Sequence, residues 1–170
     1  MRIANDRGLN SETANVNCRA RRPFNLVLRE KTALKPSGQL DAMAGAVIGA
    51  ALEVHRTLGP GFLEAIYEQA LAIELSVRGI PFEWQKTIGV LYKGHEIGES
   101  RVDFMFGDSL IVELKAVEKL LPVHQAQVLS YLKAAGCHVG LLINFHERLL
   151  RDGIKRVVLT PGMDRIQAAP

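Results

Sequence analysis

The sequence predicts one domain of the α/β (α+β) class, in which a mixed sheet of four or five strands is flanked by helices. Three patterns in the chain support this class. Apolar residues recur at helical spacing over residues 40–78, alternate with a period of two over residues 82–115, and then form two apolar strands separated by a helix. A strand–helix–strand crossover that follows an antiparallel meander requires parallel and antiparallel pairing in the same sheet.

The length of the chain and the distribution of its charge limit how it can be divided into domains. Its 170 residues have room for one domain, and a hydrophobic content of 48% can build a packed core. We expect a flexible basic extension over residues 1–38, a folded domain over residues 39–160 and a tail over residues 161–170. The extension holds eight basic and three acidic side chains, whereas residues 39–170 hold 13 basic and 15 acidic ones. A nucleic-acid partner of the domain would therefore need a metal ion or a local patch to offset its phosphate charge.

Cysteine content and hydropathy argue against several classes of protein. Cys18 and Cys137 lie far apart and match no metal-ligand spacing, which disfavours a disulfide scaffold and a zinc ribbon. No stretch approaches the roughly 20 apolar residues of a membrane-spanning helix, and residues 1–38 have no secretory pattern. We therefore expect a cytoplasmic protein with no membrane partner. The sequence leaves its oligomeric state open.

The first expected helix starts at Gln39 and carries apolar residues at helical spacing as far as His55. Asp41 lies in its first turn, where a negative charge favours the helix dipole. Gly59 and Pro60 end the helix, because glycine supplies a left-handed cap and proline prevents continuation.

The second expected helix covers residues 62–78 and ends at Gly79. Gly61 is placed as its N-cap, which makes Glu64 the third helical residue, a routine position for a capping glutamate. Glu64 also shares a helical stripe with apolar-facing residues, so we expect it on the semi-buried side; these residues are Tyr67, Leu71 and Leu75. Glu68 and Glu74 are expected to be ordinary solvated charges.

Three antiparallel strands are expected next, over residues 82–92, 95–106 and 110–115. Gly98 weakens the second strand, and turns join them at Lys93-Gly94 and Gly107-Asp108. Further along, Pro122 opens a third helix that ends near Gly136. A buried strand over residues 139–145 and an edge strand over residues 154–159 complete the order.

Charged residues within the second and third strands form the candidate site. Asp103, Glu113 and Lys115 stand in apolar runs, where charges are costly unless they are paired or bound to a metal. Two carboxylates and a lysine gathered in a small area suit a hard divalent cation. The alternative is a surface hairpin in which Asp103 and Glu113 form ion pairs with Arg101 and Lys115.

The register of this hairpin decides whether the two carboxylates meet. Asp103 opposes Glu113 if Phe106 opposes Leu110, which requires a three-residue turn over residues 107–109. A two-residue turn would shift the register by one and send Glu113 to the opposite face. The metal-site hypothesis therefore predicts the longer turn or a bulge.

A polar stripe on the third helix is a second candidate feature. His124, Gln127 and Tyr131 stand at positions i, i+3 and i+7. Gln127 and Tyr131 are suited to orienting a phosphate or a water near the metal. The alternatives are a surface His124 and a half-buried Tyr131 whose hydroxyl is solvated.

Several strings of residues together resemble a known family; they are Glu53–Tyr67 (EVHRTLGPGFLEAIY), Arg101-Val-Asp103, Val112–Ala116 (VELKA) and Leu141–Phe145 (LLINF). They look like the GxxExxY proteins, which are placed in the PD-(D/E)xK nuclease superfamily. The resemblance spans residues 39–159, and the Pro-Asp of the superfamily name is Val102-Asp103 in this sequence. It implies a restriction-endonuclease-like core with the order ααβββαββ.

The resemblance also implies roles for individual residues. Asp103, Glu113 and the backbone carbonyl of Leu114 would bind Mg²⁺ or Mn²⁺, and Glu64 would hold an outer-shell water or a second ion. Lys115 would position or activate the attacking water. Gln127 and Tyr131 resemble the Gln-x-x-x-Tyr motif of the exonuclease branch.

Together these residues predict a Mg²⁺-dependent nuclease that hydrolyses phosphodiester bonds of DNA. The resemblance of Gln127 and Tyr131 favours exonuclease-like action but leaves exo- versus endonucleolytic cleavage open. The alternative is a non-catalytic module that retains the nuclease fold and binds nucleic acid or protein. A third possibility, hydrolysis of a small phosphorylated metabolite, requires a closed pocket. The strand form and specificity of the substrate stay open at this point.

Overall fold

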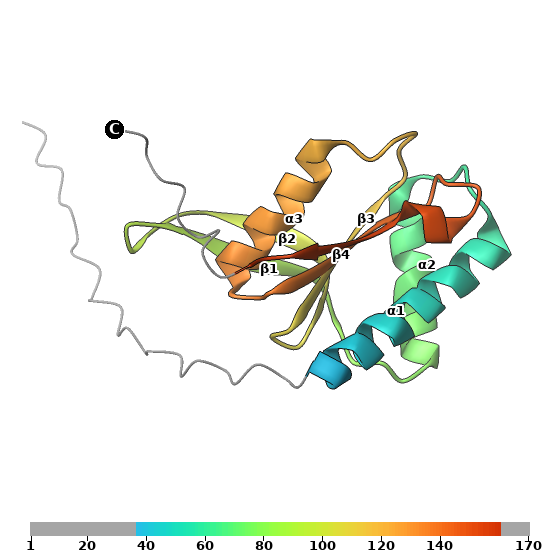
Figure 1. Ribbon diagram of the computed structural model, residues 1–170, viewed down its shortest axis with the longest axis horizontal. Coiled ribbons are helices and arrows are strands. Elements are labelled where there is room, and N and C mark those ends of the chain that lie inside the picture. Colours follow the sequence, from blue (N-terminus) through green and yellow to red (C-terminus); the bar gives the residue numbers. More distant parts are fainter. Residues whose placement is uncertain (1–36, 161–170) are drawn as a thin grey trace, which may run out of the picture. The chain divides into compact units, whose positions relative to one another are not determined.

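The structure, a computed structural model, describes residues 37–160. The predicted tail, residues 1–36 of the predicted extension and Cys18 lie outside the described residues. Three helices pack on one five-stranded sheet, with a short 3₁₀ helix (η1) before the last strand (Figure 1). In chain order the elements are α1 (Ser37–Leu58), α2 (Glu64–Val77), β1 (Glu83–Tyr92), β2 (His95–Phe106), β3 (Leu110–Lys115), α3 (Pro122–Ala135), β4 (Val139–Asn144), η1 (Leu150–Gly153) and β5 (Ile154–Val158).

The sheet is mixed, as predicted, and its spatial order β1-β2-β3-β4-β5 follows the chain. Adjacent strands pair antiparallel except β3 and β4, which pair in parallel because the α3 crossover joins them. The predicted edge position of β5 is confirmed. The central strands β3 and β4 are buried almost throughout, which explains their continuous apolar character.

Helices cover both faces of the sheet. On one face, α1 and α2 pack against alternate residues of β3 and β4, such as Val112, Leu114 and Leu141. On the other face, Val128 and Leu132 of α3 pack against the intervening positions. By alternation, Glu113 and Lys115 stand on the α3 face.

Helix starts differ from the sequence predictions. α1 begins at Ser37, so Asp41 is not in its first turn and instead pairs with Arg156 of β5, with 2.7 Å between Oδ1 and Nη1. The prediction that Gly61 caps the second helix is wrong. α2 begins at Glu64 with the extended Leu63 as its N-cap, because Gly61 has a φ of 115° and still belongs to the loop. Glu64 is therefore the first helical residue.

Close packing between β4 and α3 supports a stability prediction. A Cβ added at Gly140 would lie 2.5 Å from Cγ1 of the fully buried Val128. Gly140→Ala is therefore expected to push α3 away from the sheet and to lower the free energy of unfolding by about 1–3 kcal/mol. Urea denaturation measures this loss. Gly45→Ala is the control, since its Cβ meets no atom within 4 Å; equal stability of the two variants would contradict the prediction.

Candidate active site

The turn between β2 and β3 sets the register of the site. Phe106 pairs with Leu110 and Phe104 pairs with Val112, so the turn has three residues, 107–109. The predicted longer turn is confirmed. In this register Asp103 and Glu113 are the next residues in line, and Glu113 faces α3.

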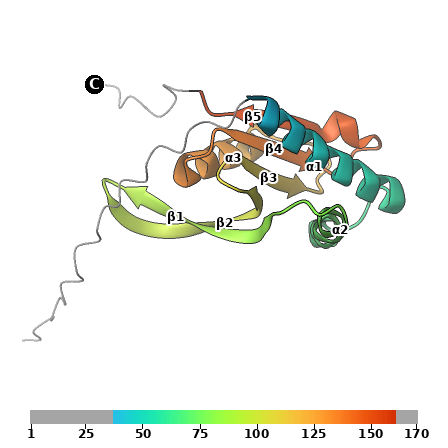
Figure 2. The ribbon, with the colours of Figure 1, turned by 90° about the horizontal axis from the view of Figure 1, so that it is seen from below.

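Pairing between β2 and β3 ends at this point. Instead of another strand residue, the Asp103 side chain accepts the Leu114 N–H at its Oδ2, over 2.8 Å. Beyond it, Val102 pairs with Lys86 of β1, and the β1–β2 ribbon curves away from β3 (Figure 2). The strands thus open beside Asp103. The carbonyl of Leu114 leaves the same edge of β3 as its N–H, and so points into this opening.

Glu113 is a buried carboxylate that lacks half of its partners. It is 3% exposed, and its Oε1 accepts a hydrogen bond from Lys115 Nζ over 2.8 Å. Its other oxygen, Oε2, has no hydrogen-bond partner among the described residues. Burial, followed by the charge of Asp103, raises the pKa of Glu113 to about 7. The alternative of a surface hairpin is confirmed in its Glu113–Lys115 ion pair, but Glu113 is buried and not on the surface.

Asp103 shows a related perturbation. Burial raises its pKa to about 6, and the charge of Glu68 adds to the rise, whereas the hydrogen bond from Leu114 opposes it. In the described chain, no ion pair joins Asp103 to Arg101, so the expected pairing is absent. Two adjacent carboxyl groups that both resist ionisation are typical of a functional site.

Lys115 connects the sheet to α2. Its Nζ lies 2.8 Å from Oε1 of Glu113 and 3.5 Å from Oε1 of Glu64. Burial lowers the pKa of Lys115, but the hydrogen bond to Glu113 and the surrounding carboxylates outweigh burial, so the net shift is upward. Lys115 is therefore a protonated amine at neutral pH.

α2 contributes a second glutamate that we expected to be solvated. Glu68 is half-buried, and its Oε1 accepts hydrogen bonds from Trp84 Nε1 (2.5 Å) and Gln85 Nε2 (2.9 Å) of β1. Glu68 is therefore not an ordinary solvated charge, because two side chains of β1 bind its carboxylate. The signal in the sequence was its position four residues after Glu64, on the same side of the helix.

The polar stripe on α3 divides into two parts. Gln127 Nε2 donates to the Tyr131 hydroxyl over 2.6 Å, and both side chains are half-buried. Burial is the main cause of the raised pKa of Tyr131, and the charge of Glu113 contributes to it, which places the hydroxyl within electrostatic reach of the carboxylates. His124 instead accepts the Leu121 N–H at the start of α3 and takes no part in the site.

A family model described as the PD-(D/E)XK nuclease superfamily matches residues 41–157, which is more than half of the chain and includes all the candidate site residues from Glu64 to Asn144. The chain belongs to the PD-(D/E)XK nuclease superfamily. Among curated proteins and solved structures, nothing matches this chain at a significant level. The sheet and helices agree with the core that the superfamily resemblance implied.

Members of the PD-(D/E)XK superfamily typically use divalent metals, and the donors of this chain suit one. The unpartnered Oε2 of Glu113 is an acceptor held out of water, which a cation would satisfy. Over residues 37–160, no three His, Cys, Asp or Glu side chains form a ready-made cage.

Sequence reasoning on this PD-(D/E)XK domain missed the supporting role of Asn144. This fully buried residue ends β4 beside Lys115, and its side chain binds both the N–H and the carbonyl of Val117. The loop after β3 is thereby tied to β4, which supports the position of Lys115. A polar residue at the end of a continuous apolar strand was the available signal.

The tyrosine of the Gly61-x-x-Glu64-x-x-Tyr67 string has a structural role in this nuclease-like fold. The Tyr67 hydroxyl donates to the Gly59 carbonyl (2.7 Å) and accepts the Phe62 N–H (3.1 Å), which holds the loop that leads to Glu64. Tyr67→Phe is expected to lower the free energy of unfolding by about 1 kcal/mol, because two backbone groups of the loop lose their hydrogen-bond partner. Urea denaturation against Tyr92→Phe, a change at an exposed tyrosine, isolates the effect; equal midpoints would disprove it.

Proposed function

We propose that this protein is a Mg²⁺-dependent nuclease of the GxxExxY branch that hydrolyses phosphodiester bonds of DNA, with exonuclease-like action. The observation that carries the proposal is a pair of carboxylates with raised pKa values, the half-buried Asp103 and the buried Glu113, beside a protonated Lys115. Structural ion pairs seldom leave a buried carboxylate oxygen without a partner, whereas a metal site requires such an oxygen.

The ligands of the ion would be carboxylate oxygens of Asp103 and Glu113 and the carbonyl of Leu114. Oε1 of Glu64 lies 3.5 Å from Nζ of Lys115. Glu64 would hold an outer-shell water or a second ion. When bound, the divalent ion neutralises charge on the phosphate and lowers the pKa of a bound water. Mn²⁺ would serve the same donors.

The remaining polar residues would orient the reactants. Lys115 carries its proton, so we assign it positioning and charge stabilisation of the attacked phosphate, and not the role of general base. The Gln127 amide and the Tyr131 hydroxyl already bind each other, which holds both near the carboxylates, where they would contact a phosphate oxygen or the attacking water.

Replacing Lys115 by alanine tests this assignment. We expect Lys115→Ala to reduce Mg²⁺-dependent cleavage of labelled single- or double-stranded DNA by at least about a hundredfold, as does removal of one charge-stabilising group in other active sites. Asp103→Ala should be equally inactive, and Lys133→Ala, which removes an exposed amine at the end of α3, should be fully active. Activity that survives in both site variants would come from a contaminant or from another site.

A non-catalytic module that binds nucleic acid or protein is the second candidate. It is favoured by the charge of residues 39–170, whose 15 acidic side chains exceed their 13 basic ones. Turnover decides between the two, because both candidates could bind Mg²⁺. Over the described residues, no helix has the length and apolar character needed to cross a membrane. A cytoplasmic location remains part of the proposal.

A further inference from the structure

A hollow with arginines on its rim lies between α1, the α1–α2 loop and the segment after β4. Its volume is about 550 Å³. Leu52, Pro60 and Leu149 supply apolar surface, and the rim carries Arg56, Arg148 and Arg151. None of the proposed metal-binding or catalytic residues lines it.

The arginines on this rim keep charge available for a ligand. Arg148 has no carboxylate within 4.0 Å among the described residues, and Arg151 has only the exposed Asp152, at 3.8 Å. Such an exposed, long pair contributes little. Arg56 is more firmly engaged, with Glu53 at 2.7 Å. Acidic residues outnumber basic ones in residues 39–170. These three arginines therefore form a local positive patch that would attract anions.

The apolar part of the hollow is open to solvent. Leu52 is 42% exposed and Leu149 is 40% exposed, although both lie beside buried residues of the core. A ligand that pairs anionic groups with a flat apolar surface would cover these side chains while binding the arginines. An unpaired nucleotide has this combination, since its base can lie against an apolar surface when it is not stacked in a duplex.

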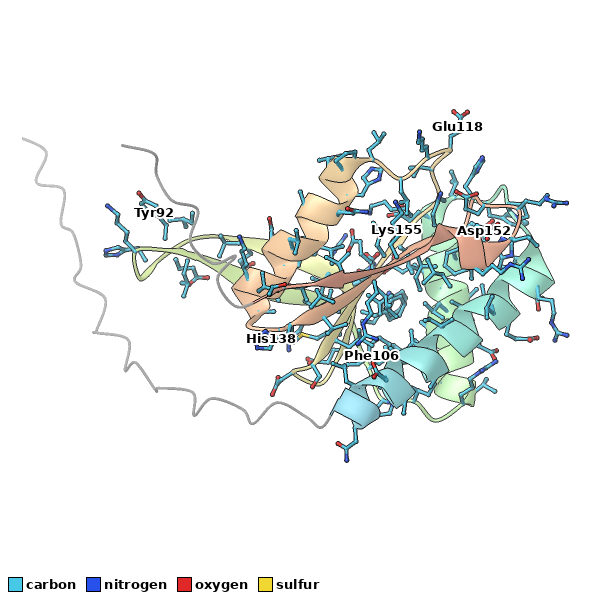
Figure 3. All side chains as sticks on the ribbon, in the orientation of Figure 1. Tyr92, Phe106, Glu118, His138, Asp152 and Lys155 are labelled. Atoms are coloured by element: carbon cyan, nitrogen blue, oxygen red, sulfur yellow. The ribbon has the colours of Figure 1, made fainter. Side chains whose placement is uncertain are left out.

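The hollow and the candidate active site share two chain segments. Pro60 is four residues before Glu64, a span of at most about 14 Å. Arg148 is four residues after Asn144, which pairs with Lys115 at the end of β3. Figure 3 shows Glu118, which follows β3, and Asp152, which follows β4, at the same end of the molecule, with His138 and Phe106 toward the other end. A strand bound at the site could therefore reach the hollow within about four nucleotides.

The rim is held in place before any ligand binds. His55 of α1 donates from Nε2 to the Glu147 carbonyl over 2.8 Å, which ties the arginine-bearing segment to α1. Tyr67 stacks on Phe145 at 4.5 Å between ring centroids and also holds Gly59 of the opposite rim. A preorganised surface loses less conformational entropy when it binds.

We propose that this arginine-rimmed hollow binds single-stranded DNA, with phosphates on Arg148 and Arg151 and an unpaired base against Leu52 and Leu149. This proposal rests on the proposed nuclease function, because that function is what would bring a DNA strand near the hollow. It assigns the holding of the substrate to residues outside the metal site. Binding at the hollow would also favour a single-stranded or frayed end over an intact duplex.

Binding and cleavage are measured separately to test it. In EDTA, Arg148→Ala/Arg151→Ala is expected to weaken binding of a short labelled single-stranded oligodeoxynucleotide at least about tenfold and to reduce the slope of log K against log salt by about 1.4, the value for two phosphate contacts. Lys133→Ala/Arg156→Ala removes the same net charge from outside the hollow and should change binding less than about threefold. Leu52→Ala should weaken binding of the single strand and leave binding of a duplex unchanged.

Each result separates this proposal from the nuclease proposal. If the wild type cleaves DNA and the two double variants bind the oligonucleotide equally well, the proposal that the hollow binds DNA is refuted and the nuclease proposal is supported. If Arg148→Ala/Arg151→Ala loses oligonucleotide binding and the wild type cleaves no DNA, the proposal that the hollow binds DNA is supported and the nuclease proposal is refuted. Equal weakening of duplex and single-strand binding would overturn the preference for single strands.

Discussion

Glu113→Gln is expected to abolish Mg²⁺-dependent DNA cleavage and at the same time to stabilise the metal-free protein. The loss of cleavage should reach at least about a hundredfold, because the proposed site loses one of its two charged ligands. The gain in stability follows from burial. Glu113 is 3% exposed and its pKa is raised to about 7, so at pH 8 the native state holds an ionised group that burial disfavours. An amide of the same shape removes this cost, and we expect the free energy of unfolding to rise by about 2 kcal/mol in EDTA.

Turnover on labelled DNA and urea denaturation in EDTA measure the two effects. Glu118→Gln is the matched control, because this exposed glutamate lies on the loop after β3 and points into solvent (Figure 3). It should alter neither quantity. A purely structural Glu113 would give the opposite stability result, since breaking a buried ion pair with Lys115 destabilises a fold by several kcal/mol.

The stability of the metal-free protein is expected to fall between pH 5 and pH 8. The pKa values of Asp103 and Glu113 are raised to about 6 and about 7, so the native state keeps protons that the unfolded chain has already released. Their contribution to stability is complete below the ordinary carboxyl pKa values and is lost as the pH rises through 6 and 7. Together the two groups should lower the free energy of unfolding by roughly 3 kcal/mol over this range.

Mg²⁺ should reverse this trend, because metal binding requires ionised ligands. A shift in melting temperature on addition of Mg²⁺ should therefore be larger at pH 8 than at pH 5. The double variant Asp103→Asn/Glu113→Gln lacks both titrating groups. The difference between its stability–pH profile and that of the wild type therefore isolates the contribution of these two residues. If the wild type and this variant have parallel profiles, the two carboxyl groups ionise normally and the metal-site proposal loses its physical basis.

The element order was predictable because it depends on local patterns. Helical spacing, the change to a period of two and the breaks at Gly59, Lys93-Gly94 and Gly136 correspond to the observed elements. Helix starts were less predictable. The start of α2 is controlled by Tyr67, whose hydroxyl binds the backbone of the preceding loop, and a capping rule based on Gly61 does not include that contact.

The candidate site was predictable in part. The three-residue turn predicted that Asp103 would lie beside Glu113, and this needed only the register of two neighbouring strands. The roles of these residues as ligands and catalysts stay predictions. Glu68 and Asn144 were missed because their partners come from β1 and from the loop after β3, at sequence separations of 16 and 27 residues.

The sequence by itself determined the order of helices and strands, the mixed pairing and the residue types available to the proposed metal site. Each of these depends on neighbours within a few positions of the chain. Only the tertiary structure decided that Glu113 is buried with an unpartnered oxygen, that Glu64 lies beside Lys115, and that three arginines surround one hollow. Those facts depend on how α1, α2 and the loops pack against the sheet, and packing between distant segments leaves no periodic pattern in the sequence.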